Sequence, residues 1–295
     1  MALPNPLCAS DLARVLRGTP SSAHLGLNAC LRPQSLRSLN MPMPLLTMAL
    51  EGEKTMFIGD STYVSTKGAV ILIPANTEFR VETRPDPKTG RFFAASLRFD
   101  AETIQQFRQI YGSKFAEWDT SPKWQMPAQG FLLDALAAWV DWAERYGTDA
   151  SHSRHRLLEI LLLLARHGYG GNLLLSQSDS WSQKLQALFM LDPAHEWRIG
   201  EVCSRLGLSE STLRRHLTAE DVGFREMLEK VRLDSGLVQV LETDLQIAQV
   251  AMSCGYQSQS RFAERFRLRF GLSPVELRQT RRAGGGDVVA LARPV

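Results

Sequence analysis

The sequence contains few of the residues that metal and redox sites require. It has six histidines and four cysteines in 295 residues, and His24 is the only histidine before residue 152. The cysteines, Cys8, Cys30, Cys203 and Cys254, show no CxxC spacing. We therefore expect no metal site and no cofactor. There is also no Ser/His/Asp or Cys/His arrangement and no glycine-rich phosphate loop, which argues against an enzyme.

Long apolar segments are lacking as well. The longest run, LLEILLLLA at 157–165, is too short to span a bilayer, so no membrane partner is expected. The chain does not start with a basic region followed by an apolar run, and we therefore expect no signal peptide and a cytoplasmic location. Charge is nearly balanced: the net value of +3 does not by itself indicate a nucleic-acid partner.

The positive charge is concentrated near the carboxyl end. Residues 255–282 contain two glutamates, Glu264 and Glu276, and seven arginines: Arg261, Arg265, Arg267, Arg269, Arg278, Arg281 and Arg282. Such an excess suits the phosphates of a nucleic acid. A run of charges is also typical of an ordinary solvated surface, so the pattern of the neighbouring residues must decide.

The stretch at 255–274, GYQSQSRFAERFRLRFGLSP, has the pattern of a helix-turn-helix. Ser258 is a good N-cap, because its hydroxyl accepts from a backbone N–H at a helix start. Phe262, Phe266 and Phe270 recur every four residues and predict one buried helical face. Gly271 is expected to end that helix. Alone, the pattern also fits an ordinary amphipathic surface helix.

A similar pattern occurs upstream, which favours the helix-turn-helix over a single surface helix. Gly207 predicts the turn, Ser209 the N-cap, and Leu213 with Leu217 the buried face of the next helix. Between the two patterns, residues 224–241 fit one helix of roughly 27 Å at about 1.5 Å per residue. A helix of that length would hold two reading helices near one duplex turn, about 34 Å, apart.

The segment from about Trp197 to Arg278 resembles the DNA-binding domain of the AraC/XylS family of transcriptional regulators. The matching stretches are LGLSESTLRRHL at 206–217, VRL at 231–233, the run at 247–271 and Ser273-Pro274. The sequence of this segment is similar to the branch of the family that contains acid-stress and virulence regulators of enteric bacteria. Two positions depart from the family pattern: Asp221 stands where glycine is common, and Glu264 where arginine is common.

Side chains on the polar faces of the two predicted reading helices are the expected DNA contacts. Arginine pairs with guanine, glutamine with adenine, and glutamate accepts from cytosine. We expect base reading by Ser211, Thr212, Arg215, Gln259, Arg261 and Glu264. We expect phosphate contacts by Arg214, Ser260, Arg265 and Arg267.

The amino-terminal part has the pattern of an antiparallel β structure followed by helices. Short apolar runs from about residue 25 to 100, broken by turn residues, predict a small barrel or jelly roll. The resemblance implies that this part is a cupin-like, effector-binding domain. Cationic side chains near the predicted strand ends are weak candidates for an anionic effector: Lys54, Arg80, Arg84 and Arg98. They also fit exposed charges that limit edge pairing of strands.

Helical patterns follow at 101–112, 131–147 and 153–168, and the last is apolar nearly all round. The resemblance implies that such helices form a homodimer interface; packing against the barrel is the alternative. The expected class is α+β. The expected parts are a cupin-like effector-binding and dimerisation domain at 1–168, a linker at 169–180, a DNA-binding domain with two helix-turn-helix motifs at 181–283, and a flexible tail at 284–295.

The predicted function is that of a sequence-specific transcriptional regulator, in particular an activator, with double-stranded DNA and RNA polymerase as partners and a small-molecule effector. The alternative is an effector-binding or protein-interaction module that does not act through DNA.

Overall fold

A computed structural model describes residues 9–17, 19, 22, 24–67, 69–147, 149–174 and 180–281. The chain divides into two compact units. The first consists of Met1–Ser35, Met43–Ser176 and Gln279–Val295, and the second of Leu36–Pro42 and Gln177–Arg278. The expected tail at 284–295 lies outside the described residues.

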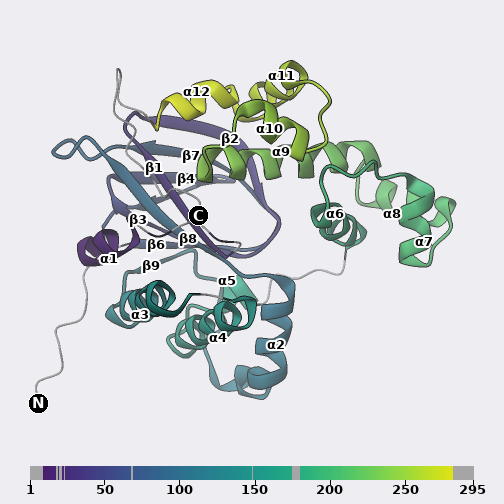
Figure 1. Ribbon diagram of the computed structural model, residues 1–295. Helices are drawn as coiled ribbons and strands as arrows, with labels where there is room; N and C mark the ends of the chain where they lie inside the picture. The colour runs from purple at the N-terminus through teal and green to yellow at the C-terminus, as the bar shows by residue number, and fades with distance from the viewer. Residues whose placement is uncertain are drawn as a thin grey trace, which may run out of the picture. The chain divides into compact units, whose positions relative to one another are not determined.

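Two antiparallel sheets are formed by the strands of the amino-terminal part of the chain (Figure 1), which confirms the β structure expected there. One sheet has the order β1-β8-β3-β6-β9 and the other β2-β7-β4-β5. The strands are β1 (Leu25–Cys30), β2 (Gln34–Met41), β3 (Leu45–Glu51), β4 (Glu53–Ile58), β5 (Ser61–Ser65), β6 (Ala69–Ile73), β7 (Thr77–Arg84), β8 (Phe92–Arg98) and β9 (Gln125–Pro127).

The residue pattern of each strand matches its place in the sheets. In β7, Phe79, Val81 and Thr83 are buried, whereas Arg80 and Arg84 are exposed, because successive side chains of a strand point to opposite faces. In β6, the residues from Val70 to Ile73 are all fully buried, as a continuous apolar run requires.

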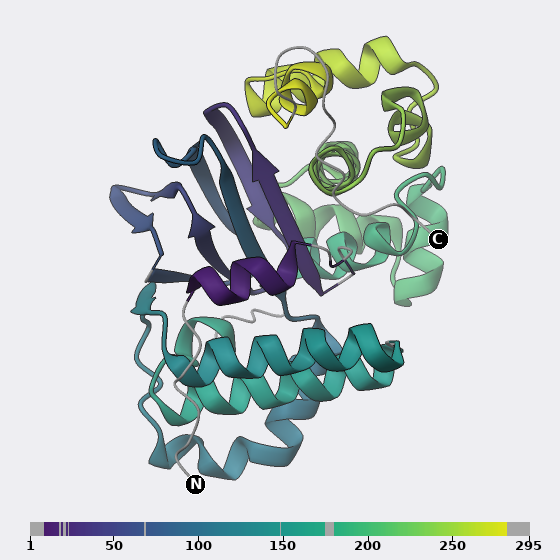
Figure 2. The same ribbon diagram turned by 60° about the vertical axis from the view of Figure 1, so that its left-hand side comes forward.

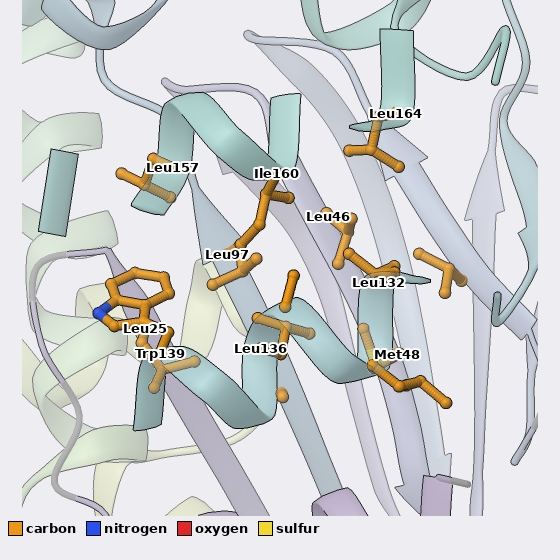
Figure 3. Close-up of a cluster of buried hydrophobic side chains, with 14 of the residues drawn as sticks. Leu25, Leu46, Met48, Leu97, Leu132, Leu136, Trp139, Leu157, Ile160 and Leu164 are labelled. Carbon is orange, nitrogen blue, oxygen red and sulfur yellow. The ribbon is translucent and has the colours of Figure 1, made fainter. Parts of the chain in front are cut away.

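Helices cover one face of the five-stranded sheet. They are α1 (Ala9–Leu16), α2 (Ala101–Tyr111), the 3-10 helix η1 (Gly112–Glu117), α3 (Gly130–Tyr146), α4 (Ala150–Arg166) and α5 (Gly171–Leu174). Figure 2 shows α3 and α4 side by side below the strands. Figure 3 shows Leu132, Leu136 and Trp139 of α3 and Leu157, Ile160 and Leu164 of α4 meeting Leu46, Met48 and Leu97 of the sheet.

The expected linker at 169–180 is wrong in its first half. Gly171–Leu174 form α5, in which all four residues are buried. The amide of Asn172 donates to the carbonyl oxygen of Leu72 in β6 at 3.2 Å. A Cβ atom on Gly171 would lie only 2.4 Å from the carbonyl oxygen of Thr120. This segment is therefore packed into the amino-terminal unit, and residues 175–179 lie outside the described chain.

Seven helices follow in the second unit: α6 (Trp181–Leu191), α7 (Ile199–Leu206), α8 (Glu210–Ala219), α9 (Phe224–Glu242), α10 (Ile247–Ser253), α11 (Gln259–Phe270) and α12 (Pro274–Gln279). Figure 1 shows α9 running between the group α6–α8 and the group α10–α12. Asp221, after α8, has a φ of 52°, so it adopts the left-handed conformation for which glycine is common. No described helix combines the length and apolarity needed to cross a bilayer.

Candidate nucleic-acid interface

The first helix-turn-helix consists of α7, the turn at Gly207 and α8. Gly207 has a φ of 67° and closes α7 in the left-handed conformation. The Ser209 hydroxyl caps α8 by accepting from the backbone N–H of Thr212 at 3.2 Å. Leu213 and Leu217 are buried against Val202 and Cys203 of α7 and against α6 and α9. The opposite face of α8 is therefore free of the core.

The second helix-turn-helix repeats this construction with α10, Gly255 and α11. The Ser258 hydroxyl caps α11 by accepting from the backbone N–H of Arg261, and Gly271 ends the helix at a φ of 88°. Phe262, Phe266 and Phe270 are fully buried and stack edge to face at 5.4 and 4.7 Å between ring centres. The predicted caps and the predicted apolar face of α11 are confirmed.

Helix α9 joins the two motifs as one uninterrupted rod. It contains 19 residues, which gives about 28 Å at about 1.5 Å per residue. Its glycine, Gly236, lets α11 approach closely: a Cβ atom there would lie 2.7 Å from the ring of Phe262. The two reading helices are thus mounted on a single element of nearly one duplex turn in length.

The predicted base-reading side chains lie on the outer faces of α8 and α11. Thr212 is half-buried, and the other five are exposed: Ser211, Arg215, Gln259, Arg261 and Glu264. Within the described chain, Arg215 and Arg261 form no ion pair, so both guanidinium groups are available to a ligand. Arginine in this position can donate two hydrogen bonds to the O6 and N7 atoms of guanine.

Of the expected phosphate contacts, Arg214, Ser260 and Arg267 are exposed. Arg214 lies 3.8 Å from Glu210, one turn earlier on α8. Such an exposed pair contributes little to stability and leaves the arginine able to exchange its partner for a phosphate.

Arg265 differs from the expectation because its guanidinium is already bound within the protein. It donates to both carboxylate oxygens of Glu229 on α9, at 2.6 and 2.5 Å. Arg269 is bound in a similar way, donating to the Lys230 carbonyl at 3.0 Å and to Asp234 at 2.8 Å. These two arginines fasten α11 to α9. The sequence alone did not reveal this because Glu229 and Arg265 are separated by 36 positions.

The interior between the two sheets of the first unit holds a buried cation. Lys54 of β4 is only 8% exposed, and its Nζ donates to the hydroxyl of Thr47 in β3 at 2.8 Å. Burial lowers the pKa of Lys54 from 10.5 to about 8. The thiol of Cys30 faces the same interior, 3.6 Å from the hydroxyl of Thr83, and burial raises its pKa to about 11.

The other three effector candidates do not share this setting. Arg80 and Arg84 lie on the outer face of β7, where Arg80 pairs with Glu82. Arg98 is buried, but its guanidinium donates to the backbone carbonyl of Ser22 at 2.9 Å. The outward placement of Arg80 and Arg84 rules out a contact with a ligand between the sheets. The described residues contain no group of three or more side chains suited to a metal ion.

Comparison with known proteins places this geometry in a known class. Residues 202–280 match a protein-family profile described as a helix-turn-helix domain. The chain is similar to the transcriptional regulator YdeO of Escherichia coli K12, with 24% identity over 222 residues that cover 73% of this chain and 82% of YdeO. It is 34% identical to the regulator GadX of the same organism over 86 residues, which are 29% of this chain and 31% of GadX.

A solved structure shares this fold. ToxT from Vibrio cholerae has a TM-score of 0.62 at 14% identity, covering 88% of this chain and 98% of ToxT. The paired helix-turn-helix motifs and the separate β domain define a DNA-binding transcriptional regulator rather than an enzyme. These likenesses confirm the resemblance of the carboxyl-terminal helix-turn-helix region to the AraC/XylS family of transcriptional regulators.

Proposed function

We propose that the exposed faces of α8 and α11 read base edges in two successive major grooves, and that the β domain controls this by binding an anionic effector. The observation that carries the first part is the exposure of Arg215 and Arg261 on two capped helices joined by one rod. Ser211, Thr212, Gln259 and Glu264 would complete the base contacts, and Arg214, Ser260 and Arg267 would hold phosphates.

A matched pair of neighbouring arginines tests the base-reading role. Arg215→Ala should weaken binding to the preferred site by about 1–3 kcal/mol and relax the preference at one base pair. Arg214→Ala should instead weaken binding to every sequence alike and reduce the salt slope by about 1. Gel-shift titrations across a salt series, on the preferred site and on random DNA, measure both. Equal loss for Arg215→Ala on the two DNAs would refute base reading.

The effector assignment rests on Lys54. A buried ammonium that donates to a neutral hydroxyl carries an uncompensated charge, and an anionic ligand group would neutralise it. ToxT, which shares the fold, has been solved with an unsaturated fatty acid bound. We therefore expect an organic monocarboxylate to occupy the interior beside Lys54, with its carboxylate on Nζ.

Titration of the full chain with oleate, followed by thermal shift and gel shift, tests this assignment. The wild type should respond to oleate and not to methyl oleate, which lacks the charge. Lys54→Met should abolish the response, whereas Arg80→Gln, which removes a cation from the outer face, should retain it. An unchanged oleate response in Lys54→Met would overturn the assignment.

Three further properties are proposed with this function. Activation through RNA polymerase is supported by similar proteins named as activators, including FapR and the urease operon activator of Escherichia coli.

A homodimer through α3 and α4 is supported by the partly exposed Leu162 and Leu163 and the exposed Tyr146. A cytoplasmic location follows from the need to reach the chromosome. Sedimentation of the wild type and of Tyr146→Ser would test the homodimer.

A further inference from the structure

One arginine of α9 contacts both the loop that leads into the first helix-turn-helix and the turn of the second. Arg232 lies in the middle of the rod and is half-buried. Its Nε donates to the carbonyl oxygen of Pro193 at 2.9 Å, and its Nη2 donates to that of His195 at 3.0 Å. Both carbonyls belong to the loop that leads from α6 into α7. The two donors of one rigid fork thereby bind the loop that leads into the first motif.

That loop is itself firmly built, so the contact fixes α7 and not a loose segment. The indole N–H of Trp197 donates to the Asp192 carbonyl at 2.9 Å. The imidazole of His195 lies 2.8 Å from the carboxylate of Glu201, which is in the first turn of α7. A shift of α7 along the rod would therefore break the bonds to Arg232.

The same guanidinium also lies against the turn of the second motif. A Cβ atom on Gly255 would lie 2.8 Å from both Cζ and Nη2 of Arg232. Gly255 also has a φ of 77°, a conformation that side chains rarely adopt. The turn between α10 and α11 thus rests directly against the arginine that binds the loop before α7.

We propose that Arg232 is a positioning residue that sets the spacing between the two half-sites that the protein accepts. This inference rests on the proposed reading of two grooves. Because the guanidinium is hydrogen-bonded to the loop before α7 and packed against the turn at Gly255, the two reading helices have one separation and one relative rotation. DNA whose half-sites lie one base pair nearer or farther is rotated by about 34–36° in addition to being displaced. Such DNA would fit the fixed pair poorly.

The test is a spacing series with the full chain. The two half-sites of the preferred sequence are kept, and one or two base pairs are inserted or removed between them. The wild type should lose about tenfold or more in affinity for each base pair of change. Arg232→Met should bind the DNA of optimal spacing more weakly than the wild type does. Its affinity should fall by no more than about threefold for each base pair inserted or removed. Arg225→Gln is the matched control, since it removes an exposed charge from the same helix and should keep the wild-type profile.

The outcomes separate this inference from the proposed function. A wild type without any spacing preference would overturn the two-groove reading and the role of Arg232 together. A wild type with a sharp preference that Arg232→Met retains, at uniformly lower affinity, would overturn the role of Arg232 alone. Should Arg232→Met fail to fold, Arg232→Lys decides, because it keeps the charge but cannot bind two carbonyls with a planar fork. A broadened profile supports the inference and an unchanged one refutes it.

Discussion

Two glycines that occupy equivalent turns face different surroundings. Gly207 and Gly255 have φ values of 67° and 77°. A Cβ atom added to Gly207 would meet no atom within 4 Å, whereas one added to Gly255 would meet the guanidinium of Arg232. Gly207→Ala should lower the free energy of unfolding by about 1–2 kcal/mol, because a residue with a Cβ is strained in the left-handed conformation. Gly255→Ala should cost more, because the alanine also displaces Arg232. Urea unfolding of both variants measures the difference, and equal losses would contradict the contact.

Lys54 should make stability depend on pH above neutrality. The folded state holds this lysine with a pKa of about 8, against 10.5 ordinarily, so between these values the unfolded chain binds more protons than the folded one. The free energy of unfolding of the wild type should therefore increase as the pH rises from about 8 to 10.5. Lys54→Met should be about 1–3 kcal/mol more stable at pH 7, and this advantage should shrink between pH 8 and 10.5. Denaturant unfolding at several pH values, with Arg80→Gln as the control, checks the trend.

The sequence carries part of the information on these residues. Lys54 is two residues from the buried Met56 in β4, so both side chains point to the same, inner face of the sheet. Arg80 alternates with Phe79 and Val81 in β7 and shares the outer face with Glu78 and Glu82. The alternation in the sequence therefore separates an inner cation from an outer one. No such local signal exists for Arg265 or Arg232. Their partners are more than 30 positions away and are determined by how the helices pack.

At the level of elements, α6 depends on a carboxylate from another helix. Glu220, at the end of α8, accepts from the backbone N–H groups of Trp181 and Ser182 at 2.7 and 2.8 Å. Burial raises the pKa of Glu220, but the Ser182 and Trp181 donors more than offset this and lower it overall. Glu220→Gln should destabilise the second unit by about 1–2 kcal/mol above pH 5.

The pH dependence of this helix cap provides the control. A carboxyl with a lowered pKa stabilises the fold above its ordinary value, and this contribution disappears as the pH falls through the folded-state value. The difference between wild type and Glu220→Gln should therefore shrink on acidification. Urea unfolding between pH 3 and 7 measures it. A pH-independent difference would show that the carboxylate charge is not what caps α6.

Elements with local signals were predictable, and those held by distant contacts were not. The caps Ser209 and Ser258 and the phenylalanines of α11 define two helices through spacing alone. Helix α5 has no such pattern: its glycines and its position after α4 suggested a linker. Only the contacts of Gly171 and Asn172 with the loop at Thr120 and with β6 reveal it as a packed segment.

For the whole molecule, one rod carrying two reading helices predicts a particular footprint. Because α9 is about 28 Å long, both motifs should reach the same face of the duplex, about one turn apart. Hydroxyl-radical footprinting of the preferred site should show two protected windows with centres about 10 base pairs apart.

A pair of substitutions assigns each window to a motif. Arg261→Ala should weaken protection in one window, and Arg215→Ala should weaken it in the other, because each arginine lies on a different reading helix. Since α9 keeps its length in both variants, the distance between the windows should stay the same. Loss of both windows with either substitution would mean that the motifs do not bind independently placed half-sites. A single window in the wild type would mean that only one motif enters a groove.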